Sequence, residues 1–545
     1  MKLAVGQLDP KVGDLGGNRR LVLSAIRRAK RAGAELLVLP ELVLLGYPPR
    51  DLLLRRGFLT AAQVEFRRVV EETSGIAVVL GHVAVAPSPP ANQQDPSASS
   101  FQGDFPVHNA AFLLAEGEVV GFQGKFRLPS FDVFEEERYF LPQSQARVVE
   151  WAGLRLGLSV CEDLWYEGGI LGAQAEAGVD LLVNVSASPY FRGKPALRHR
   201  LARRWAELAG APLVYVNLVG GQDELVFDGG SFALRPDGKF LLVAPHFQEG
   251  IYVFDLAAPP VTPPAPDGLP ELADALCLGI RDYIEKNGLP GVVVGVSGGI
   301  DSALTAALAC RALGRDRVLC AFLPGPYTSP ESGEQARSLA EALGVRLLEI
   351  PIGPVVETIT QALEPHLPVE GVVAENIQAR VRGLLLMSIS NATGHVVLCP
   401  GNKSEIAMGY NTLYGDTVGA LAPLGDLLKG EVYQLARWFN QAAGREVIPE
   451  GTLTRPPSAE LRPHQRDDQD LPPYEELDPL LSSLLVKNLS QEELIEDFGQ
   501  ELVREALARL GRAEYKRRQL PLVIKVSPKA FGMGRRWPIT CGFSG

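Results

Sequence analysis

The sequence predicts an α/β protein of several domains, and three observations support this prediction. Apolar, β-rich runs alternate with helical stretches along most of the 545 residues, which is the pattern of α/β proteins. The chain is too long for one ordinary core, so two to four domains are expected. The proline-rich stretch 256–271 suits a stiff spacer because it cannot continue a helix or a central strand. We therefore predict domains over 1–257 and 271–545, with a linker over 258–270.

In the first half, strands and helices alternate, and two segments have the pattern of hairpins. Residues 110–124 turn at Glu-Gly and residues 231–245 at Pro-Asp-Gly, so mixed sheets are expected. Residues 87–104 are polar and turn-rich, which predicts a mobile surface loop. The other expected strands are 3–8, 35–40, 76–85, 155–161, 180–186 and 212–219, and the expected helices are 18–32 and 197–209.

In the second half, the alternation is regular, which predicts a parallel doubly wound sheet with ligands at the carboxyl ends of its strands. From about residue 449 the chain is rich in proline and charge, and it then returns to helical patterning before a basic tail. The expected strands are 292–297, 318–324, 346–352 and 395–400, and the expected helices are 302–313, 331–343, 375–392 and 430–443.

Composition indicates which classes of partner and which cellular compartment to expect. Lys and Arg number 53 against 64 Asp and Glu, without the basic footprint of a nucleic-acid binder. No apolar run approaches the ~18 residues of a membrane span, so we expect small-molecule partners, no nucleic acid and no membrane. The six cysteines are scattered without C-x-x-C pairs, which argues against disulfides and zinc and favours a reducing cytoplasm.

The stretch GVVVGVSGGIDSALTAALA, residues 291–309, runs from a strand into a helix through two glycines. A P-loop would place lysine after its last glycine, whereas in this chain Gly299 is followed by Ile300. Free backbone N–H groups and the positive end of a helix still converge at this turn. We therefore expect it to bind an oxyanion or a phosphate.

Three apolar strands of the first half end at Glu41, Lys125 and Cys161. A cysteine nucleophile needs a nearby base or cation, and a glutamate base with a lysine that stabilises an oxyanion would supply both. Each residue alone also fits an inert buried cysteine, a helix-capping glutamate or a solvated lysine.

The motifs around these residues are LPELVLLGYPPRDLL, GKFRLPSFDVFEEERYF and SVCEDLW, and in this order they resemble the glutaminase branch of the carbon-nitrogen hydrolase (nitrilase) superfamily over residues 1–255. The resemblance implies an αββα sandwich in which Cys161 attacks a carboxamide, Glu41 is general base then acid, and Lys125 steadies the oxyanion. Glu136 matches a second family glutamate, and a surface charge is its equally weighted alternative. Glutamine would be bound by Phe131, Ser188 and Lys194, although relatives more often carry tyrosine at the first of these.

SGGIDS, in its strand-turn-helix context, resembles the PP-loop of ATP pyrophosphatases, although a plain glycine-rich turn is its alternative interpretation. With ENIQARVRG, PGNKSEIAMGYNTLYGDTVGALAPLGDLLKGEVYQLA and EYKRRQLP, it resembles the synthetase domain of glutamine-dependent NAD⁺ synthetases over residues 265–545. The implied ATP-binding residues are Gly295, Val296, Ser297, Gly298, Gly299, Ile300, Asp301, Ser302 and Pro400; those for deamido-NAD⁺ are Asn376, Glu405 and Lys516; and those for Mg²⁺ are Asp301 and Glu405.

Three further residues accompany this resemblance. Asn376 and Arg380 are four apart, so they are expected on one helix face. Asp416 and Lys429 are plausible phosphate-site residues, with solvated charge as their alternative.

One departure from the family concerns Pro400, which stands where relatives carry a threonine that contacts ATP. Proline has neither a hydroxyl nor a backbone N–H, so we expect weaker ATP binding.

The resemblance implies glutamine hydrolysis at the first site and ATP-dependent amidation of deamido-NAD⁺ through an acyl-adenylate at the second, with ammonia passing through an enclosed tunnel and the chain forming a homo-oligomer. Two alternatives remain open: an amidating enzyme with another carboxylate acceptor, and a non-catalytic binding protein.

Overall fold

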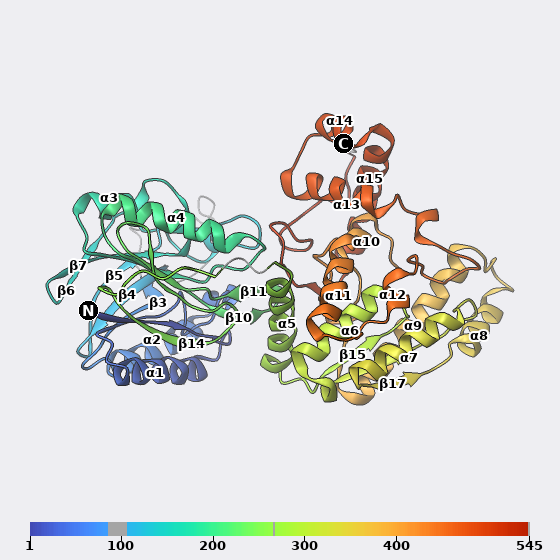
Figure 1. The fold of residues 1–545 in the computed structure, drawn as a ribbon, viewed down its shortest axis with the longest axis horizontal. Coiled ribbons are helices and arrows are strands. Elements are labelled where there is room, and N and C mark those ends of the chain that lie inside the picture. Colours follow the sequence, from blue (N-terminus) through green and yellow to red (C-terminus); the bar gives the residue numbers. More distant parts are fainter. Residues whose placement is uncertain (86–105, 265–267, 543–545) are drawn as a thin grey trace. The chain divides into compact units, whose positions relative to one another are not determined.

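The computed structural model describes residues 1–85, 106–264 and 268–542, and it separates into two compact units, Met1–Asp267 and Gly268–Gly545 (Figure 1). The boundary falls within the proline-rich stretch, and residues 268–270, which we assigned to the linker, lie in the first turn of helix α5 (Gly268–Lys286). Proline is tolerated in a first helical turn because the N–H it lacks would have no partner there. The loop expected over 87–104 lies outside the described residues. No helix in the described ranges has the length and hydropathy to cross a membrane.

Two mixed sheets form the centre of the first unit. The first sheet runs β14 (Gly250–Asp255), β1 (Lys2–Gln7), β2 (Leu36–Val38), β3 (Ala77–Val85), β4 (Val107–Ala115) and β5 (Glu118–Gly124). The second runs β13 (Phe240–Val243), β12 (Phe232–Leu234), β9 (Leu213–Asn217), β8 (Leu181–Ser186), β7 (Leu154–Val160) and β6 (Val148–Trp151). A two-stranded ribbon joins β10 (Val219–Gln222) to β11 (Leu225–Asp228). The expected hairpins are confirmed, since β4 pairs with β5 and β12 with β13, both antiparallel.

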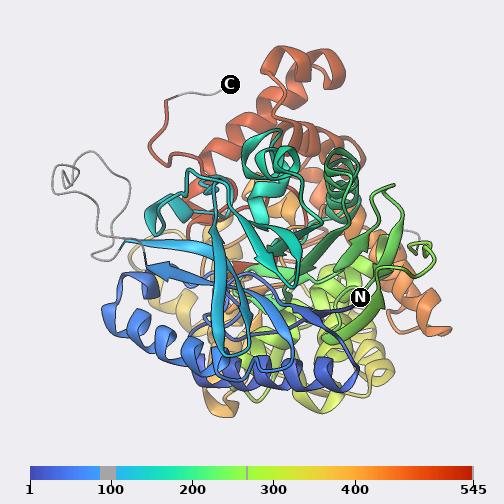
Figure 2. The same cartoon turned by 90° about the vertical axis from the view of Figure 1, so that its left-hand side faces the viewer.

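Helices cover the outer faces of this pair of sheets. In both views α1 (Leu15–Arg31) and α2 (Arg56–Val70) lie on one side, and α3 (Gly169–Ala177) and α4 (Lys194–Ala209) lie on the other (Figures 1 and 2). The inner faces of the two sheets share one apolar core, which includes side chains of β1 to β4 and of β7 to β9. The unit is therefore the αββα sandwich that the resemblance implied.

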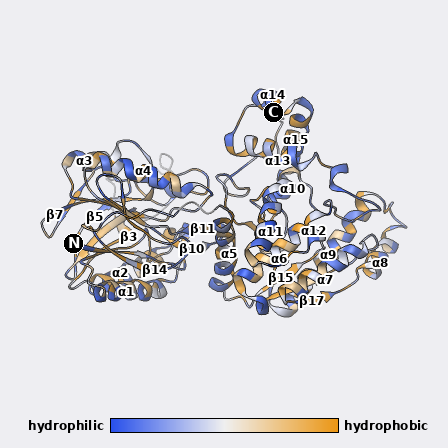
Figure 3. Ribbon diagram, viewed as in Figure 1, coloured by the Kyte–Doolittle hydropathy of each residue, from blue (hydrophilic) through white to orange (hydrophobic). Residues whose placement is uncertain are grey.

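The sequence explains why these elements form. The Asp14 carboxylate accepts a hydrogen bond from the Gly17 N–H and caps α1, and buried Val22, Ala25 and Ala29 recur at helical spacing on the face against the sheet. Strand β8 is buried along its whole length because a sheet lies on one side of it and helices on the other. Hydrophobic colour accordingly runs along the central strands, and hydrophilic colour gathers on the surrounding helices (Figure 3).

The second unit has one parallel sheet, as predicted, in the order β17 (Arg346–Glu349), β16 (Val318–Phe322), β15 (Val292–Gly295), β18 (Val396–Leu398), β19 (Leu421–Ala422) and β20 (Leu522–Val523). Every pairing between neighbouring strands is parallel. The carboxyl ends of β15 and β18 are therefore neighbours, and each leads directly into a motif that the sequence singled out.

Helices complete this unit. Beyond α5 they are α6 (Ile300–Leu313), α7 (Pro330–Leu343), α8 (Gly353–Leu363), α9 (Val372–Thr393), α10 (Lys403–Met408), α11 (Lys429–Ala443), α12 (Glu450–Thr454), α13 (Tyr474–Ser482), α14 (Gln491–Phe498), α15 (Gln500–Arg512) and α16 (Glu514–Arg517). Helices α13 to α15 share a separate apolar cluster with α10. The expected strand 346–352 ends earlier, at Glu349, and α8 follows it.

Candidate active sites

Cys161 lies at a sharp change of direction in the first unit. Strand β7 ends at Val160, and the short helix η4 (Cys161–Trp165) begins with the cysteine itself. Its φ is 40°, in the left-handed region that side-chain-bearing residues seldom adopt. Such a residue costs of order 1–3 kcal/mol and persists where the surrounding structure fixes it. The backbone thus presents this thiol at the end of the second sheet.

Three buried charged residues gather at this site. Lys125 directly follows β5, and its Nζ donates to Glu41 Oε1 at 2.9 Å and to Glu136 Oε1 at 2.8 Å. Lys125 is 1% exposed, Glu41 is 0% exposed and Glu136 is 3% exposed, so none of them is a solvated surface charge. The structure therefore brings together the four residues that the sequence singled out, because Cys161 interacts electrostatically with all three.

Two groups that the sequence analysis missed orient Glu41. Asn109 Nδ2 of β4 donates to Glu41 Oε1 at 2.6 Å, and the Ala187 backbone N–H, just after β8, donates to Glu41 Oε2 at 2.7 Å. Both carboxylate oxygens are thus held from different sheets. An asparagine inside an apolar strand, as in VHNAAFLLA, was the only sequence signal of this role.

The protonation of the cluster follows from burial. Burial, and then the charge of Glu41, raises the pKa of the Cys161 thiol, so the thiol is protonated at neutral pH and needs a base. Burial raises the pKa of Glu136 to about 7, and Lys125 opposes this shift. Burial alone would lower the pKa of Lys125, but the Glu136 and Glu41 carboxylates outweigh it and raise that pKa. The lysine therefore stays charged.

Two further residues tie the site together. Tyr47, in the loop after Glu41, donates its hydroxyl to Glu136 Oε1 at 2.8 Å. The Asp163 carboxylate in η4 accepts the backbone N–H groups of Phe126, Arg127 and Val160, each at 3.0 Å. Asp163 thereby fastens the chain that follows Lys125 to the turn that carries Cys161.

The three residues expected to bind glutamine differ in their surroundings. Ser188 is buried, and its N–H donates to Asn217 Oδ1 at 2.8 Å. Lys194, at the first turn of α4, donates to the Pro189 carbonyl at 2.8 Å. Phe131 is 50% exposed and packs edge-on against Phe134. The structure therefore places Ser188 and Lys194 on one connected segment, whereas Phe131 packs against Phe134 in the segment between β5 and Glu136.

In the second unit, the SGGIDS turn follows β15 and opens α6. Gly298 has φ +82°, and a Cβ there would lie 2.6 Å from the Ser332 carbonyl oxygen. Ser302 Oγ accepts the Ser297 N–H at 3.1 Å and donates to the Gly299 carbonyl at 3.0 Å. Gly299 caps α6 without a side chain, so the first N–H groups of this helix are left for an anion.

A cavity of about 910 Å³ opens at this turn, at the carboxyl ends of the parallel strands. Its lining includes every residue that the sequence analysis assigned to ATP, deamido-NAD⁺ or Mg²⁺: Gly295, Val296, Ser297, Gly298, Gly299, Ile300, Asp301, Ser302, Asn376, Pro400, Glu405 and Lys516. The volume suits a ligand of nucleotide size, since small-molecule pockets span about 300–1,000 Å³.

Lys429 stands between the two carboxylates expected to hold a metal. Its Nζ donates to Asp301 Oδ2 at 2.6 Å and to Glu405 Oε1 at 3.1 Å. Asn402 Nδ2 donates to Asp301 Oδ1 at 2.8 Å, and Asn402 Oδ1 accepts the Glu405 N–H as the N-cap of α10. Asn402 was missed, although an asparagine just before a helical segment is a capping signal.

The donor set fits Mg²⁺. Burial raises the pKa of Glu405 to about 8, and the Lys429 ammonium opposes this shift. Asp301 and Glu405 share one cationic partner, so their oxygens converge on one point, and Mg²⁺ is commonly held by one or two carboxylates together with substrate phosphates. No cluster of three or more potential metal-ligating side chains occurs in the described ranges.

The remaining predicted residues hold different positions. Asn376 accepts from the Thr412 hydroxyl at 2.8 Å. Lys516 Nζ donates to the Gly409 carbonyl at 2.7 Å, and burial lowers its pKa. Asp416 accepts the Thr412 N–H at 2.7 Å, and desolvation of its carboxyl group raises its pKa to about 6. Arg380 donates to the Leu413 carbonyl and does not line the cavity, so of these two α9 residues only Asn376 lines it.

Comparison with known proteins defines the class first. The family model described as carbon-nitrogen hydrolase matches residues 2–262, and that described as NAD synthase matches residues 272–520. The chain is 40% identical to glutamine-dependent NAD⁺ synthetase of Synechocystis sp., covering 99% of both chains. It is 37% identical to the enzyme of that name from Thermotoga maritima, covering 100% of this chain and 99% of the relative.

A solved structure agrees over the full length. Glutamine-dependent NAD⁺ synthetase from Acinetobacter baumannii in complex with ADP is 35% identical, with a TM-score of 0.77 over 100% of this chain and 99% of that one. The synthetase from Cytophaga hutchinsonii has a TM-score of 0.82 at 21% identity over 99% and 98%, which shows the fold. The chain therefore belongs to the glutamine-dependent NAD⁺ synthetase family, whose members are amidating ligases.

Proposed function

We propose that this enzyme makes NAD⁺ by amidating deamido-NAD⁺, with ATP as the activating substrate and with ammonia released from glutamine in the first unit. The observation that carries the proposal is the pairing of two sites on one chain. A buried Cys-Glu-Lys site suits amide hydrolysis, and a separate cavity opens on an anion-binding turn.

In the first unit, Glu41 takes the proton from the Cys161 thiol as the sulfur attacks the amide carbon of glutamine. Lys125, charged and fixed between two carboxylates, stabilises the oxyanion. Glu41 then returns the proton to the departing nitrogen, and ammonia leaves a thioester on Cys161. Glu41 then deprotonates a water molecule, which attacks the thioester carbon. The carbon–sulfur bond breaks to give glutamate, and Glu41 returns the proton to the Cys161 thiolate. Glu136 and Tyr47 hold the lysine in place.

In the second unit, a carboxylate oxygen of deamido-NAD⁺ attacks the α-phosphorus of ATP, and the bond to the β-phosphate breaks to release pyrophosphate. Ammonia then attacks the acyl carbon and AMP leaves. The N–H groups at the start of α6 receive the charge that develops on the pyrophosphate. Asn376 and Lys516 are proposed to contact the dinucleotide.

Mg²⁺ held by Asp301 and Glu405 would supply charge neutralisation on the phosphates. The ammonium of Lys429 would keep the two carboxylates together until the nucleotide binds, and it can then donate to a phosphate oxygen.

Three expectations complete the proposal. Ammonia is expected to travel in an enclosed tunnel, because in bulk water it would be protonated and lost. A homo-oligomer is expected, supported by the exposed apolar side chains Leu384 and Met387 on α9, and light scattering would measure its size. A cytoplasmic location suits a reaction that needs the free Cys161 thiol.

The finer mechanism is tested by isotope transfer. Deamido-NAD⁺ labelled with ¹⁸O in the nicotinate carboxylate is incubated with Mg-ATP and ammonium, and the AMP is analysed by mass spectrometry. Adenylation predicts one ¹⁸O atom in each AMP, because the attacking oxygen leaves with the nucleotide. Unlabelled AMP formed together with NAD⁺ would contradict the acyl-adenylate. Parallel reactions with other carboxylate acceptors test the alternative acceptor.

A further inference from the structure

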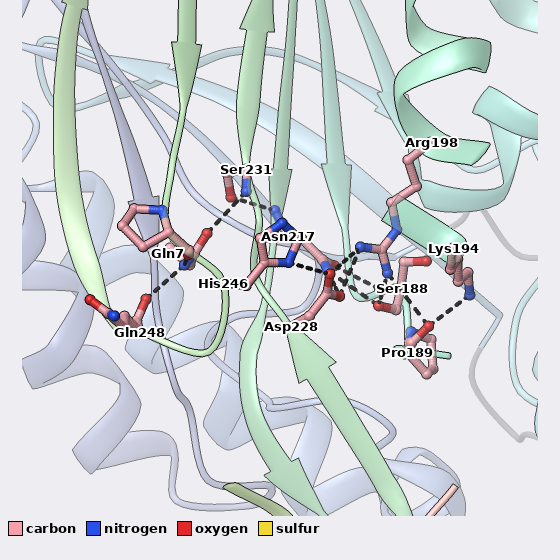
Figure 4. Close-up of polar contacts among 11 residues, drawn as sticks. Gln7, Ser188, Pro189, Lys194, Arg198, Asn217, Asp228, Ser231, His246 and Gln248 are labelled. Atoms are coloured by element: carbon pink, nitrogen blue, oxygen red, sulfur yellow. Dashed lines mark hydrogen bonds and ion pairs between the residues drawn. The ribbon is translucent and has the colours of Figure 1, made fainter. Parts of the chain in front are cut away.

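A buried ion pair lies beside the glutaminase site without belonging to the Cys-Glu-Lys group. Arg198, in the second turn of α4, donates from Nη1 to Asp228 Oδ1 at 2.7 Å and to Oδ2 at 2.8 Å. Arg198 is 1% exposed and Asp228, the last residue of β11, is 0% exposed. Figure 4 shows the guanidinium of Arg198 reaching from its helix toward Asp228 and Ser188.

Asp228 is held by further donors. Asn217 Nδ2 lies 3.3 Å from Asp228 Oδ1, and His246 Nδ1 lies 3.1 Å from Asp228 Oδ2. Although burial works against the charged form, Arg198 and His246 lower the pKa of Asp228 to about 2. Asp228 is therefore a fixed negative charge that orients the guanidinium.

The other side of Arg198 faces the backbone that carries the substrate-binding serine. Arg198 Nη2 donates to the Ser188 carbonyl at 2.8 Å and approaches the Pro189 carbonyl at 3.5 Å. The N–H of Ala187, one residue earlier, donates to Glu41 Oε2. A single short segment, residues 187–189, thus links the arginine to the general base and to Ser188.

We propose that Arg198, oriented by Asp228, is a positioning residue of the glutaminase reaction: it fixes the backbone of residues 187–189 and, through it, the Glu41 carboxylate and the glutamine-binding Ser188. This inference rests on the proposed function of the first unit. Arg198 does not touch the reacting atoms and acts only through this segment.

The contacts of Lys194 explain why a second cation is needed beside this segment. Lys194 Nζ donates to the Pro189 carbonyl at 2.8 Å in the structure. When this ammonium turns to the α-carboxylate of glutamine, the Pro189 carbonyl loses that donor, and Arg198 remains to hold the segment. The planar guanidinium suits this task because it donates to a carboxylate and to backbone carbonyls at once.

The test separates positioning from stability by removing both charges together. Replacing a buried ion pair by apolar residues of similar size is often neutral for stability, so Arg198→Met/Asp228→Leu is compared with wild type. The kcat and KM for glutamate release, NAD⁺ synthesis from ammonium, and the thermal unfolding temperature are measured. We expect kcat/KM for glutamine to fall about a hundredfold, with KM raised and kcat lowered. Synthesis from ammonium is expected to stay unchanged.

Arg198→Lys and Arg203→Met complete the design. Arg203 lies on the same helix and donates to the Gly238 carbonyl, so its loss is expected to leave glutamine kinetics unchanged. Arg198→Lys keeps the charge, and its kcat/KM for glutamine is expected to lie between that of the double variant and that of wild type.

Wild-type glutamine kinetics in the folded double variant would overturn the proposal. If the double variant fails to fold, Arg198→Lys decides the matter, since an unchanged KM for glutamine in that variant would also overturn it. Failure of the proposed function appears separately, as wild-type enzyme that releases no glutamate.

Discussion

At the scale of single residues, Lys125 is the cation that contacts both buried carboxylates of the glutaminase site, Glu41 and Glu136. It is buried between Glu41 and Glu136, and removing its charge would leave two buried carboxylates without their cation. We expect Lys125→Met to lower glutamine hydrolysis by about 10²–10³-fold, the cost of losing one oxyanion donor. NAD⁺ synthesis from ammonium should be unaffected. Glutamate release near the wild-type rate would contradict the assigned role.

His82 gives a pH-dependent prediction. It is fully buried in β3, stacked on Phe66 at 4.4 Å, and burial lowers its pKa to about 3. The unfolded chain binds a proton near pH 6.5, so the contribution of His82 to stability is present above that pH and is lost as pH falls toward 3. Between pH 6.5 and 5.5 the free energy of unfolding should drop by about 1 kcal/mol from this group.

Replacing this histidine should therefore flatten the acid side of the stability profile. Calorimetry of His82→Leu at pH 6.5 and 5.5 is expected to show a smaller loss than wild type, whereas the exposed His366→Leu should behave like wild type. Equal losses in wild type and His82→Leu would show that His82 is not a buried neutral group.

Replacing Pro400 is expected to improve the binding of ATP. Pro400 lines the nucleotide cavity and offers no donor there. Pro400→Thr should lower the KM for ATP by about 2–13-fold, the range of one hydrogen bond of about 0.5–1.5 kcal/mol. Steady-state kinetics with saturating ammonium measures this change. A KM for ATP that does not move would mean that no ATP contact is missing at this position.

At the scale of elements, the turn between β15 and α6 depends on close backbone approach. Gly298→Ala would place a Cβ 2.6 Å from the Ser332 carbonyl oxygen, so the turn must open and the phosphate site is lost. We expect NAD⁺ synthesis from ammonium to fall at least about tenfold, while glutamine hydrolysis persists. Gly288→Ala is the matched control, since its φ is +66° and nothing lies within 4 Å. An active Gly298→Ala enzyme would contradict the assigned phosphate site.

The same elements show how much the sequence alone could predict. The SGGIDS turn and the strand end at Cys161 were predictable, because glycine spacing and apolar runs are local signals. The strand expected to end at Glu41 ends earlier, at Val38. The pairing of Arg198 with Asp228 was not, since it joins residues 30 positions apart whose charges look like ordinary surface charges in the sequence. The sequence could not distinguish a buried Glu136 from a surface charge, and the structure shows that its side chain is buried. The two-residue strands β19 and β20 are too short to show a hydrophobic period in the sequence.

At the scale of the whole molecule, the chain carries two separate chemistries in two compact units. Each has its own core and a self-contained set of reactive residues. We therefore expect each half-reaction to survive loss of the other site, with ammonia as the only shared intermediate.

The central claim is tested most directly by the nitrogen source. Wild type and Cys161→Ala are given Mg-ATP and deamido-NAD⁺ with either glutamine or ammonium, and NAD⁺ and AMP are measured by mass spectrometry. Wild type should form NAD⁺ and AMP from both nitrogen sources, and Cys161→Ala from ammonium alone. NAD⁺ formation from glutamine by Cys161→Ala, or wild-type glutamine hydrolysis without NAD⁺ from either source, would contradict the assignment of two sites.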